Sequence, residues 1–172
     1  GVVTNIWLII LCWALLGFGM AGIGMSVIHD ANHGSYSKNS TVNYLLGRVM
    51  NLVGAFAPNW KIQHNVLHHT YTNIHGLDDD IRTKLIIRLS KHAPLEAVHR
   101  YQYIYVFFFY GFNTLFFIVG DFIKLFNYNR TGMVERQKTK FNVELLKLIF
   151  TKVLYIFFTV ALPMIVTSLL WW

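Results

Sequence analysis

An uncharged apolar run near the N-terminus constrains this chain more than any other feature. Between Val2 and Ile28 the sequence contains no Asp, Glu, Lys or Arg. A helix needs about 20 apolar residues to cross a bilayer, so a span over residues 6–28 fits within this run. Of the 172 residues, 55% are hydrophobic and only 13% are charged, a balance that is unusual for a soluble domain. We therefore expect an integral membrane protein.

A second span is expected over residues 153–170. Lys147 and Lys152 precede this apolar segment, and Trp171 and Trp172 follow it. Basic and aromatic side chains are typical of the two surfaces of a bilayer. Because a bilayer leaves no water to satisfy backbone polar groups, we expect the spans to be helices and the fold class to be all-α.

The apolar segment 103–120 is not expected to be a simple crossing. Eight Lys or Arg residues lie in 29–102 and seven lie in 121–152, so one crossing between these blocks would place one of them on the wrong side. We expect this segment to be re-entrant or interfacial. The weakly apolar segment 42–57 is too short to span, and we expect it to be an interfacial amphipathic helix. Residues 29–147 would then form one cytoplasmic face within a single membrane domain covering 1–172.

Five of the eight histidines fall in two clusters after the first span. The first cluster contains His29 and His33, and the second contains His64, His68 and His69. Residues four apart lie on nearly the same face of a helix, so each cluster can direct its imidazoles toward one volume. Imidazole binds zinc, copper, iron and nickel. Five histidines therefore predict a histidine-rich helical face that holds two metal ions, or one site with further ligands elsewhere.

Several neighbouring residues are candidates for supporting roles. Asp30 follows a candidate ligand, and we expect its carboxylate to orient an imidazole. Trp60 precedes His64 by four residues, and it either lines a substrate cavity near the metal or anchors the helix at the interface. An acidic loop follows the second cluster and contains His75, Asp78, Asp79 and Asp80. These residues either steady the site or bind a cation, or they form a solvated loop, which is the interpretation that we favour.

Two classes of function are compatible with these features. One is a membrane enzyme in which iron and oxygen attack a C–H bond of a lipid. The other is a non-enzymatic membrane protein that binds or transports metal. A transport path would need ionisable side chains inside the spans, and the two expected spans contain none. The net charge of +7 fits the positive-inside bias and acidic lipids or proteins as partners, and we expect no nucleic acid partner.

Two motifs resemble those of the membrane fatty acid desaturases, close to the acyl-lipid and acyl-CoA type that includes the front-end enzymes. They are HDANHGSYS at 29–37 and WKIQHNVLHHTYTN at 60–73. The resemblance implies a di-iron centre with the ligands His29, His33, His64, His68 and His69. It also implies oxygen-dependent insertion of a cis double bond into an acyl chain carried by CoA, an acyl carrier or a lipid. Electrons would come from a ferredoxin or a cytochrome b5-like donor.

One departure from the family pattern affects this expectation. No third histidine box of the HxxHH or QxxHH type follows His69. We therefore expect the sequence to be an incomplete desaturase domain, inactive alone, with a span before Gly1 and the third box after Trp172. Related hydroxylases and ketolases share the boxes, and Asp30 together with the following Gly34 and Ser35 favours desaturation.

Overall fold

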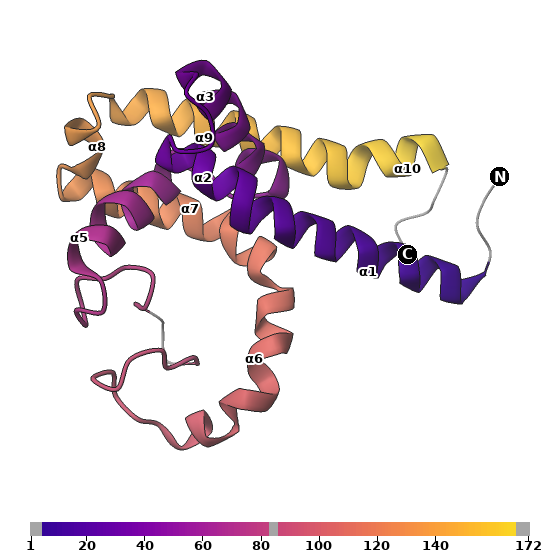
Figure 1. Cartoon of the computed structure of the whole chain (residues 1–172), viewed down its shortest axis with the longest axis horizontal. Coiled ribbons are helices and arrows are strands. Elements are labelled where there is room, and N and C mark those ends of the chain that lie inside the picture. The colour runs from indigo at the N-terminus through magenta and orange to yellow at the C-terminus, as the bar shows by residue number, and fades with distance from the viewer. Residues whose placement is uncertain (1–4, 83–85, 168–172) are drawn as a thin grey trace. The chain divides into compact units, whose positions relative to one another are not determined.

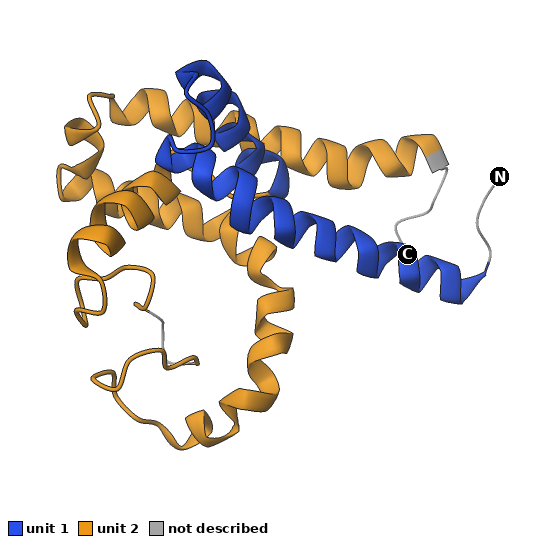
Figure 2. Ribbon diagram, in the orientation of Figure 1, with its two compact units in different colours: residues 1–53 blue, residues 54–172 orange. Residues whose placement is uncertain are grey.

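The computed structural model describes residues 5–82 and 86–167, and every regular element within these ranges is a helix (Figure 1). This confirms the all-α fold class. The chain divides into two compact units, residues 1–53 and 54–172, each of which is described by itself (Figure 2). Trp171, Trp172 and the last three residues of the expected second span lie outside the described residues.

The first unit begins with the long apolar helix α1 (Ile6–Ile23). Asn5 caps this helix, because its side-chain oxygen accepts hydrogen bonds from the backbone N–H groups of Trp7 at 3.0 Å and Leu8 at 3.3 Å. None of the residues of α1 is buried within the protein. An apolar helix without a protein partner on any side is suited to contact with lipid.

The first span ends in the first histidine cluster. Helix α1 continues through the π-helical turn η1 (Gly24–Ile28) into α2 (His29–His33). Together they form a candidate membrane span of 28 residues, Ile6–His33. Gly34 then ends the helix with a φ of 77°, a left-handed conformation that glycine adopts without steric cost. The two histidines therefore lie on the last turns of the apolar helix.

A short helical hairpin completes the first unit. Helix α3 (Ser40–Arg48) and the 3-10 helix η2 (Val49–Val53) occupy most of the segment 42–57, which we expected to be an interfacial helix. Helix α2 packs against α3, and the Asn32 side chain donates to the Gly47 carbonyl at 3.2 Å. A Cβ atom on residue 47 would lie 2.5 Å from the Asn32 oxygen, so glycine permits this close approach.

The second unit begins with the helix that carries the second cluster. Helices α4 (Ala57–Trp60), η3 (Lys61–His68) and α5 (His69–Tyr71) follow one another without interruption. Pro58 lies in the first turn, where its missing N–H has no consequence. The histidines of the second cluster thus lie on a helix, but residues Lys61–His68 form wider π-helical turns. Such widened turns are often found at functional sites.

The apolar segment after the basic loop is bent. The 3-10 helix η4 (Ala97–Tyr101) and α6 (Gln102–Gly111) are followed by α7 (Asn113–Arg130). The pair is apolar enough to cross a membrane, but it is bent by 76° at the break. By length and composition the pair is either a broken span or a re-entrant loop.

The second unit ends with the second candidate span. Helix α9 (Phe141–Ile156), the π-helical turn η5 (Phe157–Ala161) and α10 (Leu162–Thr167) contain the 26-residue span Phe141–Val166. The helix thus begins well before residue 153. Pro163 has no N–H to donate within the helix, and the widened turn directly precedes it.

The core of the second unit forms where α7 and α9 pack together beside α8 (Met133–Arg136). The buried side chains of this core are Phe56, Ile62, Leu125, Tyr128, Val134 and Leu148. The histidine-bearing helix contributes Ile62, and Phe56 directly precedes it. The core therefore fixes that helix against α7.

A buried ion pair lies beside this core. Lys152 donates to the Asp121 carboxylate at 2.5 Å and to the Gly54 carbonyl at 2.6 Å, and the Asn59 side chain donates to the Asp121 carbonyl at 2.7 Å. Lys152 is only 5% exposed, so this lysine at the start of the expected second span is buried within the protein. Its charge is satisfied by a carboxylate that lies 31 residues earlier in the sequence.

Removing one partner of this pair should destabilise the second unit. We expect Lys152→Met to lower the free energy of unfolding by about 3–5 kcal/mol, because it leaves the Asp121 charge buried and uncompensated. Thermal or denaturant unfolding in detergent measures the loss. Lys140→Met is the matched control, because Lys140 is an exposed lysine of the same unit and its loss should cost only about 0–1 kcal/mol. Equal losses in the two variants would contradict this assignment.

Candidate metal centre

The first histidine cluster brings two ring nitrogens together at the end of the first span. The Nε2 atoms of His29 and His33 lie 3.2 Å apart. His29 Nδ1 lies 2.9 Å from the Asp30 carboxylate. An ionised carboxylate only accepts hydrogen bonds, so this contact assigns the proton to Nδ1 and leaves the Nε2 lone pair available. Asp30 thus contacts the imidazole that we expected it to orient.

The second cluster gathers three imidazoles on the π-helical segment. The rings of His64 and His68 stack with their centroids 5.0 Å apart and an interplanar angle of 17°. His69 stands edge-on to both rings, at 4.9 Å from His64 and 5.4 Å from His68. All three predicted residues of this cluster therefore lie side by side.

The acidic loop holds two of these imidazoles. His64 Nδ1 lies 2.6 Å from an Asp80 oxygen, and His68 Nδ1 lies 2.9 Å from an Asp78 oxygen. Our expectation of a solvated loop was wrong for Asp78, which is completely buried. The residue types alone gave no signal of this, although aspartates soon after a histidine cluster are the partners that metal-binding imidazoles commonly use.

The loop backbone folds around the Asp78 carboxylate. Asn73 and Gly76 adopt left-handed conformations with φ of 63° and 85°, which turn the chain back on itself. The carboxylate accepts hydrogen bonds from the N–H groups of Asn73 at 2.8 Å and Asp80 at 3.0 Å. Burial raises the pKa of Asp78, but the bonds from His68 and these two N–H groups outweigh burial and lower that pKa below its usual value. The carboxylate therefore stays ionised and acts only as an acceptor.

The donor set of the second unit fits a transition metal. Potential ligand atoms of His64 and His68 lie within 4.8 Å of each other, and the Asp80 oxygen that contacts His64 Nδ1 lies within the same distance of both. In neutral imidazoles, the contacts of both Nδ1 atoms with carboxylates place the proton on Nδ1 and make Nε2 the atom with a lone pair for metal. A carboxylate behind a metal-binding imidazole is the usual support of such ligands. Imidazole nitrogens with nearby carboxylate oxygens suit iron and zinc.

Trp60 lies directly against the second cluster. Its ring stacks on the His64 ring with the centroids 4.5 Å apart and an interplanar angle of 26°. This contact follows from the four-residue spacing on one helix. It covers one face of the His64 ring and limits the directions from which water can reach it. A role in lining the substrate cavity stays a prediction.

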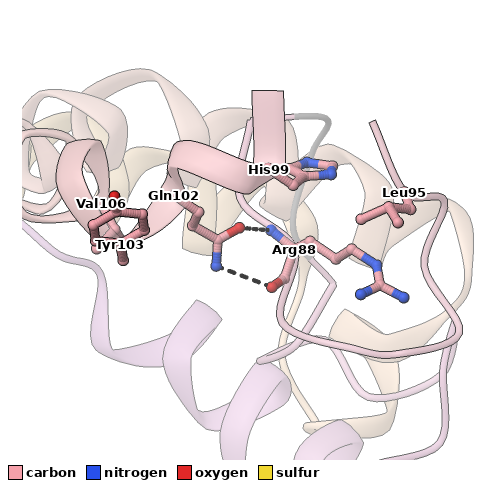
Figure 3. A pocket seen from close by; sticks show the side chains of 6 residues that line it. All are labelled: Arg88, Leu95, His99, Gln102, Tyr103 and Val106. Atoms are coloured by element: carbon pink, nitrogen blue, oxygen red, sulfur yellow. Dashed lines mark hydrogen bonds between the residues drawn. The ribbon is translucent and has the colours of Figure 1, made fainter. Parts of the chain in front are cut away.

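A hollow of the same unit lies away from the five clustered histidines. Two of its lining residues are joined by hydrogen bonds, because Gln102 accepts from the Arg88 N–H at 2.7 Å and donates to the Arg88 carbonyl at 3.1 Å (Figure 3). Its lining residues are Arg88, Leu95, His99, Gln102, Tyr103 and Val106. None of the five clustered histidines lines this hollow.

Substitution of the buried carboxylate should weaken metal binding. We expect Asp78→Asn to raise the dissociation constant for Zn²⁺ by roughly 10–100-fold, because an amide no longer enforces the proton on His68 Nδ1. A competition titration against a chromogenic chelator measures the constant. Asp79→Asn is the control, since Asp79 contacts Tyr128 and an amide oxygen can still accept that bond. Unchanged binding in Asp78→Asn would contradict the role of this carboxylate.

Comparison with known proteins places these features in one family. The fatty acid desaturase family model matches residues 5–172. The chain is 40% identical over 116 residues to the sn-1 linoleoyl-lipid 6-desaturase of Arthrospira platensis, covering 67% of this chain and 32% of that protein. It is 38% identical over 153 residues to the acyl-lipid (8-3)-desaturase of Physcomitrium patens, covering 86% of this chain and 31% of that protein.

The chain thus spans about a third of the length of these two relatives. No solved structure matches it. The match to the family model covers nearly the whole chain and includes both histidine clusters. The chain belongs to the fatty acid desaturase family.

Proposed function

We propose that this protein desaturates fatty acyl chains in an oxygen-dependent reaction at a di-iron centre. Its ligands in this chain are His29, His33, His64, His68 and His69. The observation that carries the proposal is the set of carboxylates on the histidine Nδ1 atoms, with Asp80 on His64, Asp78 on His68 and Asp30 on His29. This arrangement prepares Nε2 atoms for metal.

The chemistry requires an oxidant strong enough for an unactivated C–H bond. Iron, when bound, supplies the oxygen-dependent oxidation. The acyl chain gives up two hydrogens to form a cis double bond, an external donor adds two electrons, and two protons come from solvent, so that one O₂ becomes two waters. We propose a ferredoxin or a cytochrome b5-like protein as this donor.

The protein residues contribute orientation and exclusion of water. The aspartates hold a proton on Nδ1 of each imidazole that they contact, which fixes the ring angle and keeps Nε2 basic. Trp60 covers the His64 ring on one side. Imidazoles held in this way need little rearrangement when the metal binds, which favours a defined ligand geometry.

We propose an acyl group of a membrane lipid as the substrate. Two relatives are named for linoleoyl-lipid and acyl-lipid substrates, which supports this choice over acyl-CoA or an acyl carrier. The first histidine cluster lies at the end of a 28-residue apolar helix. A lipid substrate could reach that position from within the bilayer.

We further propose that the histidine clusters face the cytoplasm. In this arrangement residues 6–28 and 153–170 span the bilayer, and 29–147 form the cytoplasmic face. The distribution of Lys and Arg supports it, because both basic blocks then lie on the inner side. The bent pair of α6 and α7 enters the membrane and returns on the same side.

Loss of one ligand should abolish activity. We expect His68→Ala in the intact protein to remove desaturation of lipid extracts and to lower bound iron, because the second cluster loses an imidazole. Gas chromatography of the fatty acids and iron analysis measure the two effects. His92→Ala is the control, since His92 is exposed in the basic loop outside both clusters. Full activity of His68→Ala would exclude His68 as a ligand.

The proposed topology predicts labelling from one side. We expect Lys91→Cys and Arg136→Cys, each in a Cys12→Ser background, to react with an impermeant maleimide only from the cytoplasmic side. These two exposed positions flank the bent helix pair. Labelling of the two positions from opposite sides would mean that the pair crosses the bilayer.

A further inference from the structure

A chain of polar side chains connects helix α7 to the second histidine cluster. The Lys124 ammonium donates to the side-chain oxygen of Gln63, which lies 61 residues away in the sequence. The Gln63 amide nitrogen donates to one oxygen of Asp80 at 2.8 Å. The other Asp80 oxygen lies 2.6 Å from His64 Nδ1. Lys124 thus contacts a candidate metal ligand only through two intermediates.

The charged groups in this series of side chains determine which atom donates and which accepts in each hydrogen bond. An ammonium has only donors, so Gln63 must present its oxygen to Lys124 and its NH₂ group to Asp80. Without Lys124, the Gln63 oxygen would lose its charged donor, and only the Asp80 carboxylate would hold the amide in place. The ionised carboxylate in turn requires the proton of His64 on Nδ1, which leaves Nε2 for metal.

We propose that Lys124 is a positioning residue for His64 and acts through Gln63 and Asp80. The proposal rests on the metal-binding function proposed above for the second cluster. Lys124 fixes the orientation of the Gln63 amide. The amide in turn fixes the position of the Asp80 carboxylate, and the carboxylate fixes the tautomer of His64. Neither Lys124 nor Gln63 is itself a ligand in this proposal.

A second bond from α7 reaches the same loop. The Tyr128 hydroxyl donates to the Asp79 carboxylate at 2.5 Å. Tyr128 follows Lys124 by four residues, so the two side chains project from the same face of the helix. Residues 72–82, which contain the loop aspartates, form turns and bends but no helix or strand. Two of the loop carboxylates are therefore held in place by α7, one through Tyr128 and one through Gln63.

Cobalt binding to the intact protein in detergent tests the proposal without reference to activity. Visible absorption during a Co²⁺ titration gives the dissociation constant. We expect Lys124→Met to raise it by roughly threefold to tenfold, less than the 10–100-fold typical when the partner of a ligand is removed. Lys124→Arg keeps a cationic donor and should retain most of the affinity. Lys147→Met, which removes a lysine bonded to Glu144, should leave the constant unchanged.

A double substitution separates this role from other effects of Lys124. Lys124 also interacts electrostatically with Asp121. If Lys124 acts through Gln63, Gln63→Met alone should weaken cobalt binding at least as much, and adding Lys124→Met should weaken it no further. Additive losses would overturn the proposal, as would Lys124→Met binding Co²⁺ like Lys147→Met.

The same experiment distinguishes failure of this proposal from failure of the proposed function. A wild-type protein that binds no Co²⁺ at the histidines would contradict the metal centre itself and this proposal with it. Normal binding by the wild type together with unchanged binding in Lys124→Met would overturn the positioning role alone. Should Lys124→Met fail to fold, Gln63→Met decides the question, because the proposal requires that variant to lose affinity.

Discussion

The second unit depends on the buried ion pair between Asp121 and Lys152. A buried charge is tolerated only when it is paired and its remaining hydrogen bonds are made, and here the Gly54 carbonyl and the Asn59 amide complete the set. These contacts join α7, α9 and the start of the histidine-bearing helix at one point. These contacts fix the positions of the three helices relative to one another, and no metal ligand takes part in them.

Helix α7 connects this ion pair to the candidate metal centre. Lys124, Leu125 and Tyr128 follow Asp121 by three, four and seven residues, so all four share one face of the helix. Asp121 holds the histidine-bearing helix, and Leu125 is buried in the core. Lys124 reaches Gln63, and Tyr128 reaches the acidic loop. This face of α7 thus contacts the helix that carries the second histidine cluster and the loop that carries its aspartate partners.

The sequence allowed prediction of the helical membrane fold and of the candidate ligands, because apolar length and histidine spacing are local patterns. It did not allow prediction of the burial of Asp78 or Lys152. Each of these charges is stabilised by a partner far along the chain or by loop backbone whose path depends on Asn73 and Gly76. A run of aspartates in a loop is usually solvated, and only the folded structure shows that Asp78 of this run is buried.

The central claim is that carboxylates fix the tautomer of the histidines in the second cluster. Nitrogen-15 NMR of the histidine-labelled, Zn²⁺-loaded protein tests it most directly, because protonated, free and metal-bound ring nitrogens have separate chemical shifts. The account predicts that His64 and His68 carry a proton on Nδ1 and bind the metal through Nε2. Metal bound through Nδ1, or a proton on Nε2 of either residue, would contradict it.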